Sequence, residues 1–360
     1  MSTGPGIPVS HGGSRGRSTV DFDLAHHGDR DVADGLVDLA VNVRLPAPPE
    51  WLRRELELAI PRLAAYPDVR EAAAAIAARH GRAPADVLPT AGAAEAFTLL
   101  ATALRPHRVA VIHPQFTEPE AAVRAAGHSV ARVLLREVDG FTLRPAAVPE
   151  DADLVFVGNP TNPTSVLHPA AALRGLGRPG RIVVVDEAFL DAVPGEPETL
   201  AGERLPGFVV LRSLTKTWGI AGLRAGYALA EPDVVRRLRA VQPPWSVSSL
   251  AATAMIACSG PDALGEAESL AKEAVRDREF LVAGLRELDV EVAGVPRAPF
   301  VLVRVSEGDH VRAALRSAGY AVRRGDTFPG LGPDWLRIAV RDEDTAREFL
   351  TELARVLPGN

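Results

Sequence analysis

The stretch SLTKTWGIAGLRAGY (residues 213–227) contains one of only two lysines among the 40 basic residues of this 360-residue chain. The other, Lys272, follows Glu268 by one helical turn and fits an exposed ion pair. Lys216 instead lies among glycines and apolar residues. A guanidinium stays protonated, whereas a buried primary amine can lose its proton and attack a carbonyl. Lysine at position 216 therefore indicates covalent chemistry there.

The composition is that of a folded protein with a small-molecule partner. Hydrophobic residues make up 47% and charged residues 24% of the chain, which is typical of a soluble globular protein. A net charge of −6 without a basic run argues against a nucleic-acid partner, and no apolar stretch has the length of a membrane span. The single cysteine, Cys258, excludes an internal disulfide and a multi-cysteine metal site. We expect a cytoplasmic protein with no membrane partner and no metal ion.

The order of apolar runs predicts two domains, with one large α/β domain as the alternative at this length. From residue 51 to about 240 strands alternate with helices, which predicts a large α/β domain with a mainly parallel sheet. The pattern changes after 240, and residues 241–360 are predicted to form a smaller α+β domain. Residues 21–50 form an N-terminal segment that is a candidate to join the smaller domain. Residues 1–20 are predicted to be a flexible tail.

The strand RIVVVD (residues 181–186) first suggests a phosphate-loop ATPase, whose magnesium-binding strand also ends in acidic residues. Here Asp186 and Glu187 stand at the end of the apolar run. That class also requires the loop G-x-x-x-x-G-K-[ST]. The residues before Lys216 are VVLRSLT, and Lys272 lies in SLAKEA, so neither lysine has the glycines. We therefore exclude the ATPase.

A reactive lysine beside a phosphate-binding segment indicates pyridoxal phosphate instead. Ser213, Thr215 and the backbone between Gly219 and Gly222 offer hydroxyl and amide donors to a phosphate, and Arg224 lies close behind them. Asp186 follows a buried strand, where ligand sites of α/β sheets lie. A carboxylate there can stabilise the protonated ring nitrogen that makes the cofactor an electron sink.

Other strand ends supply the remaining contacts that this cofactor needs. Asn162, in GNPTNPTSV, can donate to its phenolic oxygen, and Phe116, in HPQFTEP, can stack on its ring. The helix that begins in TAGAAEAF can bind the phosphate with the backbone of Gly92, Ala93 and Ala94. Each residue alone is more typical of a core or a turn than of a cofactor site. Their combination, in chain order and each at a strand end, predicts the cofactor site.

From about residue 26 to the C-terminus the sequence resembles the fold-type I pyridoxal-phosphate enzymes, in the branch of histidinol-phosphate aminotransferase and threonine-phosphate decarboxylase. The motifs that carry the resemblance are AGAAEAF, NPTNPTS, VVVDEAF, SLTKTWGIAGLRAGY and LRIAVR. The resemblance implies the fold-type I architecture, pyridoxal 5'-phosphate, a small phosphorylated amino-acid-like substrate and a homodimer.

The resemblance also implies a role for each candidate residue. Lys216 would hold the cofactor covalently, Asp186 would contact the ring nitrogen, and Asn162 the phenolic oxygen, with Phe116 stacked on the ring. The implied phosphate ligands are Ser213, Thr215, Arg224 and, in the neighbouring subunit's site, Tyr66 from AAYPD. An arginine in an edge strand such as LRIAVR usually faces solvent, but the resemblance implies that Arg337 binds the substrate carboxylate.

The two enzymes of this branch differ in which substrate bond breaks, and details of the sequence favour the decarboxylase. The segment HHGDRDVADGLVDLAVNVRLPAPP is similar to the decarboxylase beginning and keeps its first asparagine as Asn42. Phe189, in the cofactor site, stands where the aminotransferase usually has a tyrosine that donates to the phenolic oxygen. VRRGDTFPGLGPDWLRIAVR also looks closer to the decarboxylase, with Arg323 as a candidate for the substrate carboxylate or phosphate. Two residues depart from the pattern: Ser165 replaces the usual glycine, and Arg324 replaces an acid common in the decarboxylase.

The sequence therefore predicts decarboxylation of O-phosphothreonine to aminopropanol phosphate, the side-arm precursor of cobalamin. A pyridoxal-phosphate aminotransferase such as histidinol-phosphate aminotransferase is the alternative. A third hypothesis is a catalytically idle relative that serves as a binding protein.

Overall fold

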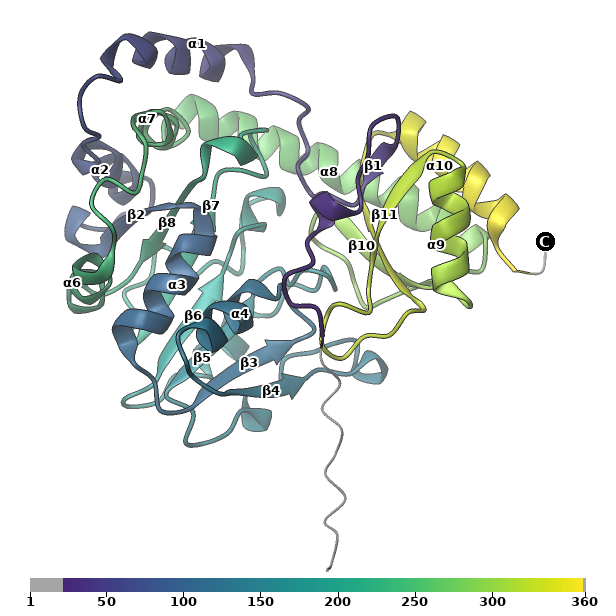
Figure 1. The fold of residues 1–360 in the computed structure, drawn as a ribbon, viewed down its shortest axis with the longest axis horizontal. Helices are drawn as coiled ribbons and strands as arrows, with labels where there is room; N and C mark the ends of the chain where they lie inside the picture. The colour runs from purple at the N-terminus through teal and green to yellow at the C-terminus, as the bar shows by residue number, and fades with distance from the viewer. Residues whose placement is uncertain (1–21, 359–360) are drawn as a thin grey trace, which may run out of the picture.

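The computed structural model describes residues 22–358, so the tail predicted over residues 1–20 lies outside the described residues. Two sheets organise this part of the chain, one of seven strands and one of five (Figure 1). The long helix α8 (Pro261–Glu287) runs from the larger sheet to the smaller one. Neither α8 nor any other helix within residues 22–358 has the length and apolar character needed to cross a membrane.

The larger sheet is mainly parallel. Its strands are β2 (Val87–Ala91), β3 (Val109–His113), β4 (Val130–Leu134), β5 (Leu154–Gly158), β6 (Ile182–Asp186), β7 (Phe208–Ser213) and β8 (Ala225–Leu229). They lie in the order β2-β8-β7-β6-β5-β3-β4. All neighbours from β4 to β7 pair in parallel, whereas β8 is antiparallel to both β7 and β2. This sheet confirms the predicted α/β class.

Helices cover both faces of the larger sheet. One face packs against α2 (Arg70–Arg79), α5 (Ala170–Arg174) and α7 (Ser249–Ala257), and the other against α3 (Gly92–Leu104), α4 (Glu118–Ala125) and α6 (Pro232–Val241). Within β6, Val183 and Val185 belong to the first core and Val184 to the second. A strand buried on both sides has no polar face, and for this reason RIVVVD shows no alternation.

The smaller sheet includes the N-terminal segment. Its strands are β1 (Val37–Leu39), β9 (Glu291–Val292), β10 (Phe300–Arg304), β11 (Tyr320–Arg324) and β12 (Trp335–Ala339), in the order β1-β11-β12-β10-β9. The second half of α8 shares a core with this sheet, together with α9 (Gly308–Ser317) and α10 (Glu343–Val356). Because β1 pairs in parallel with β11, residues near the start of the chain lie beside residues near its end.

The change from one core to the other falls inside α8. Helix α7 contacts α1 (Glu50–Ala59) and α2, and its Met255 is buried in the core of the larger sheet. Ala263 and Ala267, in the first turns of α8, belong to the same core, whereas Leu281 and Leu285 belong to the core of the smaller sheet. The apolar pattern of a long helix does not reveal that its two halves face different sheets.

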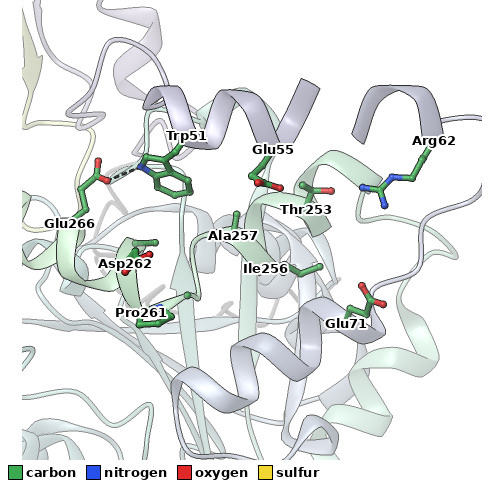
Figure 2. A pocket seen from close by; sticks show the side chains of 12 residues that line it. Trp51, Glu55, Arg62, Glu71, Thr253, Ile256, Ala257, Pro261, Asp262 and Glu266 are labelled. Atoms are coloured by element: carbon green, nitrogen blue, oxygen red, sulfur yellow. Dashed lines mark hydrogen bonds between the residues drawn. The ribbon is translucent and has the colours of Figure 1, made fainter. Parts of the chain in front are cut away.

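Helix α1 is fastened to the segment that contains Lys216. The indole Nε1 of Trp51 donates to Glu266 Oε2 of α8 at 2.7 Å, as Figure 2 shows. The same indole packs edge-on against the buried ring of Trp218, with ring centroids 5.3 Å apart. At Gly219, where φ is +64°, a Cβ would stand 2.8 Å from the carbonyl oxygen of Leu45. The turn around Lys216 is therefore enclosed by the N-terminal segment and α1.

Candidate active site

A cavity of about 460 Å³ lies at the carboxyl ends of β5, β6 and β7. Because these strands are parallel, their ends meet at one edge of the sheet, where α/β folds bind ligands. Most of the candidate residues lie in the cavity wall, namely Ala93, Ala94, Phe116, Asn162, Asp186, Phe189, Ser213, Thr215, Lys216, Arg224, Arg323 and Arg337. Two of the candidates, Gly92 and Tyr66, are not among its lining residues.

The Lys216 amine is buried beside two guanidinium groups. Burial and the positive charges of Arg224 and Arg337 lower the pKa of Lys216, and the negative charges of Asp186 and Asp29 raise it. The net result is a pKa of about 8. A lysine in this environment is partly neutral near physiological pH. The neutral amine is the form that can attack a carbonyl or accept a proton.

Asp186 is a partly buried carboxylate, and one of its two oxygens has no hydrogen-bond partner among residues 22–358. The backbone N–H of Ala188 donates to Oδ1 at 3.1 Å, and within residues 22–358 no hydrogen bond reaches the other oxygen. Burial raises the pKa of Asp186 to about 6, although that N–H and the charge of Lys216 both lower it. A protonated ring nitrogen would supply the partner that this carboxylate lacks.

The other end of the cavity is suited to a dianion. Ser213 Oγ and Thr215 Oγ1 lie 2.8 Å apart, and the N-terminus of α3 adds Ala93 and Ala94. The Arg224 guanidinium lies above Gly92, where a Cβ would come within 2.6 Å of Nη2. Gly92 therefore makes room for Arg224. Hydroxyls, a guanidinium and a helix N-terminus together form a phosphate site.

Arg337 and Asn162 join the two sheets across the cavity. Arg337 Nη1 donates to Asn162 Oδ1 at 2.7 Å, and Nη2 donates to the carbonyl oxygen of Ala40. Among the described residues, its buried Nε and the buried Oδ1 of Asn42 have no hydrogen-bond partner. Burial lowers the pKa of Arg337 to about 9. Unpartnered buried polar atoms beside a cavity indicate a ligand.

The guanidinium of Arg323 makes hydrogen bonds to groups of the protein itself. Its Nη2 donates to the carbonyl oxygen of His26 at 2.8 Å and to Thr327 Oγ1 at 2.6 Å, and its Nη1 lies 3.5 Å from Asp31. Arg323 therefore fastens the N-terminal segment to the smaller sheet. The predicted contact between Arg323 and substrate stays a prediction.

The three aromatic candidates occupy different environments. The Phe116 ring lies 5.4 Å from the ring of His27, on the cavity wall. Phe189 is also in the wall, with its ring packed at 78° against Phe300. Tyr66 is outside the cavity, is 75% exposed, and stacks on Trp245 at 4.2 Å.

The sequence model of the family described as "Aminotransferase class I and II" matches residues 34–353. The chain belongs to the class I and II aminotransferases. This family depends on pyridoxal phosphate, so the protein is a pyridoxal-phosphate enzyme. The buried amine of Lys216, the open carboxylate of Asp186 and the phosphate site fit that cofactor.

Both branches named by the sequence resemblance occur among similar proteins. A histidinol-phosphate aminotransferase of Mycobacterium tuberculosis is 53% identical over 321 residues, which are 88% of this chain and 87% of that protein. A threonine-phosphate decarboxylase of Salmonella typhimurium is 31% identical and covers 94% of this chain and 98% of its own length. The structure of histidinol-phosphate aminotransferase from Clostridium acetobutylicum superposes with a TM-score of 0.80 at 23% identity, covering 88% of this chain and 97% of that one.

The N-terminal segment contributes residues to the candidate active site of this pyridoxal-phosphate enzyme that the sequence did not assign. His26, His27, Gly28 and Asp29 line the cavity, and a Cβ at Gly28 would meet the carbonyl oxygen of Ala40 at 2.3 Å. In the sequence, this segment stands out only by its His-His-Gly run, which resembles the beginning of the decarboxylase and does not indicate a place in the cavity wall. Its place at the cavity depends on contacts with residues about 300 positions later, such as Arg323.

A second cavity, of about 490 Å³, lies between α1, α2, α7 and the start of α8 (Figure 2). Its charged lining residues are Glu55, Glu71, Asp262, Glu266 and Arg62. None of the predicted site residues lines it, so the first cavity is the candidate active site.

Proposed function

We propose that this enzyme transfers an amino group between a phosphorylated amine and a 2-oxo acid, with histidinol phosphate as the first amine to test. The observation that carries the proposal is 53% identity, over 88% of the chain, to a protein named histidinol-phosphate aminotransferase. The sequence alone favoured decarboxylation. The order is reversed here because the relative named as a decarboxylase is 31% identical.

We also propose that the cavity residues hold the cofactor as the family resemblance implies. Lys216 would bind it covalently, Asp186 would pair with its ring nitrogen, and Asn162 would donate to its phenolic oxygen. Phe116 would cover the ring, and the phosphate would lie among Ser213, Thr215, Arg224 and the start of α3. Once bound, the cofactor supplies an electron sink for charge that develops on the substrate's α-carbon.

The chain's own residues would then bind the substrate and move its proton. Lys216 Nζ, with a pKa near 8, accepts the proton that leaves the α-carbon. The guanidinium of Arg337 binds the carboxylate of the 2-oxo acid, for which its unpartnered Nε is available. The N-terminal segment covers the cavity with His26, His27 and Asp29, which limits the access of water.

Decarboxylation of O-phosphothreonine to aminopropanol phosphate is the second candidate, and Phe189 favours it. This side chain lies in the cavity wall and has no hydroxyl with which to donate to the cofactor's phenolic oxygen. In this reaction the bond to the carboxylate breaks instead of the bond to the α-proton. Placement of the carboxylate by Arg337 would decide which bond stands perpendicular to the cofactor ring.

We propose that two copies of the chain form the active unit, in the cytoplasm. Tyr66 and Trp245 are 75% and 59% exposed, and Leu58, Ile60 and Leu63 add exposed apolar surface between α1 and Tyr66. Exposed apolar side chains in one region favour a protein interface. In such a dimer Tyr66 would reach the phosphate of the partner's cofactor. A sedimentation equilibrium mass of one chain would contradict this proposal.

One assay separates the two reactions. The cofactor-loaded enzyme is supplied with O-phosphothreonine while released carbon dioxide is measured, and in parallel with histidinol phosphate and 2-oxoglutarate while glutamate is measured. Glutamate without carbon dioxide supports the aminotransferase. Carbon dioxide without glutamate would replace it with the decarboxylase.

A further inference from the structure

Ser165 has a backbone conformation that normally requires glycine. Its φ is +62°, in the left-handed region, and its side chain is fully buried. A residue with a Cβ is rarely found there unless the surrounding structure holds it in place. The contacts of the Ser165 side chain therefore indicate its role.

The hydroxyl of Ser165 binds a segment of the smaller sheet's domain. Its Oγ accepts from the backbone N–H groups of Arg297 at 3.0 Å and of Ala298 at 2.8 Å, and lies 3.3 Å from the Ala298 carbonyl oxygen. The Arg297 N–H also reaches the Ser165 carbonyl oxygen at 2.8 Å. Val166 pairs with Pro296 in an isolated antiparallel bridge. With glycine at this position the Ala298 N–H would lose its acceptor, whereas the Arg297 N–H would keep the carbonyl oxygen of residue 165.

The two segments that Ser165 joins lead to opposite walls of the active site. On one side, the Ser165 N–H donates to the Thr161 carbonyl oxygen at 2.7 Å, which closes the turn that carries Asn162. On the other side, residues 296–298 lead into β10, which pairs with β12, and Leu302 is directly opposite Arg337. Arg337 in turn donates to Asn162 at 2.7 Å. The Ser165 contacts and the Arg337–Asn162 contact are two links between the same two walls.

Residues 297 and 298 also bind to a buried arginine of α8 through their carbonyl oxygens. Arg278 of α8, itself 5% exposed, donates through Nη1 to the carbonyl oxygens of Arg297 and Ala298 at 3.0 and 3.4 Å. With α8 on one side and Ser165 on the other, this segment has little freedom to shift. Any displacement of the Asn162 turn relative to Arg337 must break the Ser165 contacts.

We propose that Ser165 is a positioning residue that sets the distance between the cofactor wall, which carries Asn162, and the substrate wall, which carries Arg337. The proposal rests on the functions proposed above for Asn162 and Arg337, and it holds for either reaction because both involve a substrate carboxylate. Loss of the hydroxyl is expected to loosen carboxylate binding while cofactor binding stays nearly unchanged.

Hydrogen exchange tests the contacts directly. Proline has no N–H, so in the run Pro296-Arg297-Ala298-Pro299 only two amides exchange, and both contact Ser165. In Ser165→Gly, which fits the left-handed turn, and Ser165→Ala, which keeps the Cβ, the Ala298 amide should exchange roughly tenfold faster, as expected for the loss of one hydrogen bond. The Arg297 amide keeps the carbonyl oxygen of residue 165 as an acceptor and should change less. Unchanged exchange in both variants would overturn the proposal.

Carboxylate affinity tests the positioning role. It is measured by titrating the cofactor absorbance of the loaded enzyme with O-phosphothreonine and with glutamate. In both variants the dissociation constant should rise about fivefold or more, with the cofactor dissociation constant changed less than about twofold. Faster exchange with unchanged carboxylate affinity would mean that the contacts are only structural and would overturn the proposal.

Two control variants match the chemical changes. Ser317→Ala removes an exposed hydroxyl that donates to Ala313 in α9, and Asp289→Gly introduces glycine at another left-handed position, with φ +55°, at the end of α8. Neither should alter exchange in residues 296–299 or carboxylate affinity. If the wild-type enzyme neither transfers nor decarboxylates the substrates named above, the proposed function fails, but exchange and titration still decide the role of Ser165.

Discussion

The two walls of the active site differ in whether their polar groups already have hydrogen-bond partners within the protein. On the wall formed by the larger sheet, Asp186 keeps an oxygen without a partner, and Ser213 and Thr215 contact mainly each other. On the wall formed by the smaller sheet, Arg323 and Arg337 donate to the carbonyl oxygens of His26 and Ala40. The first wall therefore has free groups ready for a cofactor. The second wall is assembled by the N-terminal segment, and a substrate that binds there competes with internal contacts.

The largest expected effect is at Lys216 on the cofactor wall. Lys216→Arg keeps the positive charge but removes the amine, so we expect a retained fold and activity reduced at least about 10³-fold. The covalently held cofactor should also be lost, which is checked by visible absorbance after gel filtration. Lys272→Arg, at an exposed ion pair with Glu268, is the matched control and should change neither property. An unchanged spectrum in Lys216→Arg would refute its assignment.

The next effect is expected at Asp186. Asp186→Asn removes the charge that would pair with the ring nitrogen and should cost about 3 kcal/mol of transition-state stabilisation, or roughly 10²-fold in kcat. Because Ser213, Thr215 and Arg224 remain, the cofactor should still bind. Measured kcat and a cofactor titration check both statements. Activity within twofold of wild type would mean that the open carboxylate has another purpose.

A smaller and different effect is expected on the substrate wall. Arg337→Lys removes the planar fork, so KM for the carboxylate substrate should rise about 10- to 100-fold while the cofactor spectrum stays unchanged. Arg341→Lys is the control, since Arg341 is partly buried and donates to the carbonyl oxygen of Val41 but does not line the cavity. If both variants raised KM equally, the effect of Arg337→Lys would come from loosening the N-terminal segment, and Arg337 would not bind the substrate directly.

The smallest effect is a shift in pH dependence. An amine attacks a carbonyl only in its neutral form. With Lys216 as the proposed attachment point, the rate at which the cofactor-free protein recombines with pyridoxal phosphate should rise as pH passes through about 8. Arg337→Met removes a positive charge that lowers the pKa of Lys216, so the midpoint should move to higher pH. Stopped-flow absorbance measures this midpoint. A shift to lower pH would contradict the stated electrostatics.

The sequence predicted the cofactor wall better than the substrate wall, for a physical reason. Asp186 and Ser213 follow apolar runs that can only be buried strands, and parallel strands bring their ends to one edge. Arg323 and Arg337 also stand in predicted strands, but their partners come from the beginning of the chain. No local pattern shows that His26 and Asp29 line the cavity or that Arg323 is already bonded. Likewise, the core shared by α7 and the start of α8 depends on packing that no local pattern shows.

The place of Gly92 under Arg224 has a consequence for how this chain can vary. A methyl group at position 92 would collide with the guanidinium at 224, although the two residues are far apart in the sequence. Replacement of Gly92 by alanine would push the Arg224 guanidinium away from its present place, and the φ of +78° at position 92 is itself unfavourable for alanine. A substitution at residue 92 would thus disturb the phosphate site through a side chain from a distant part of the sequence.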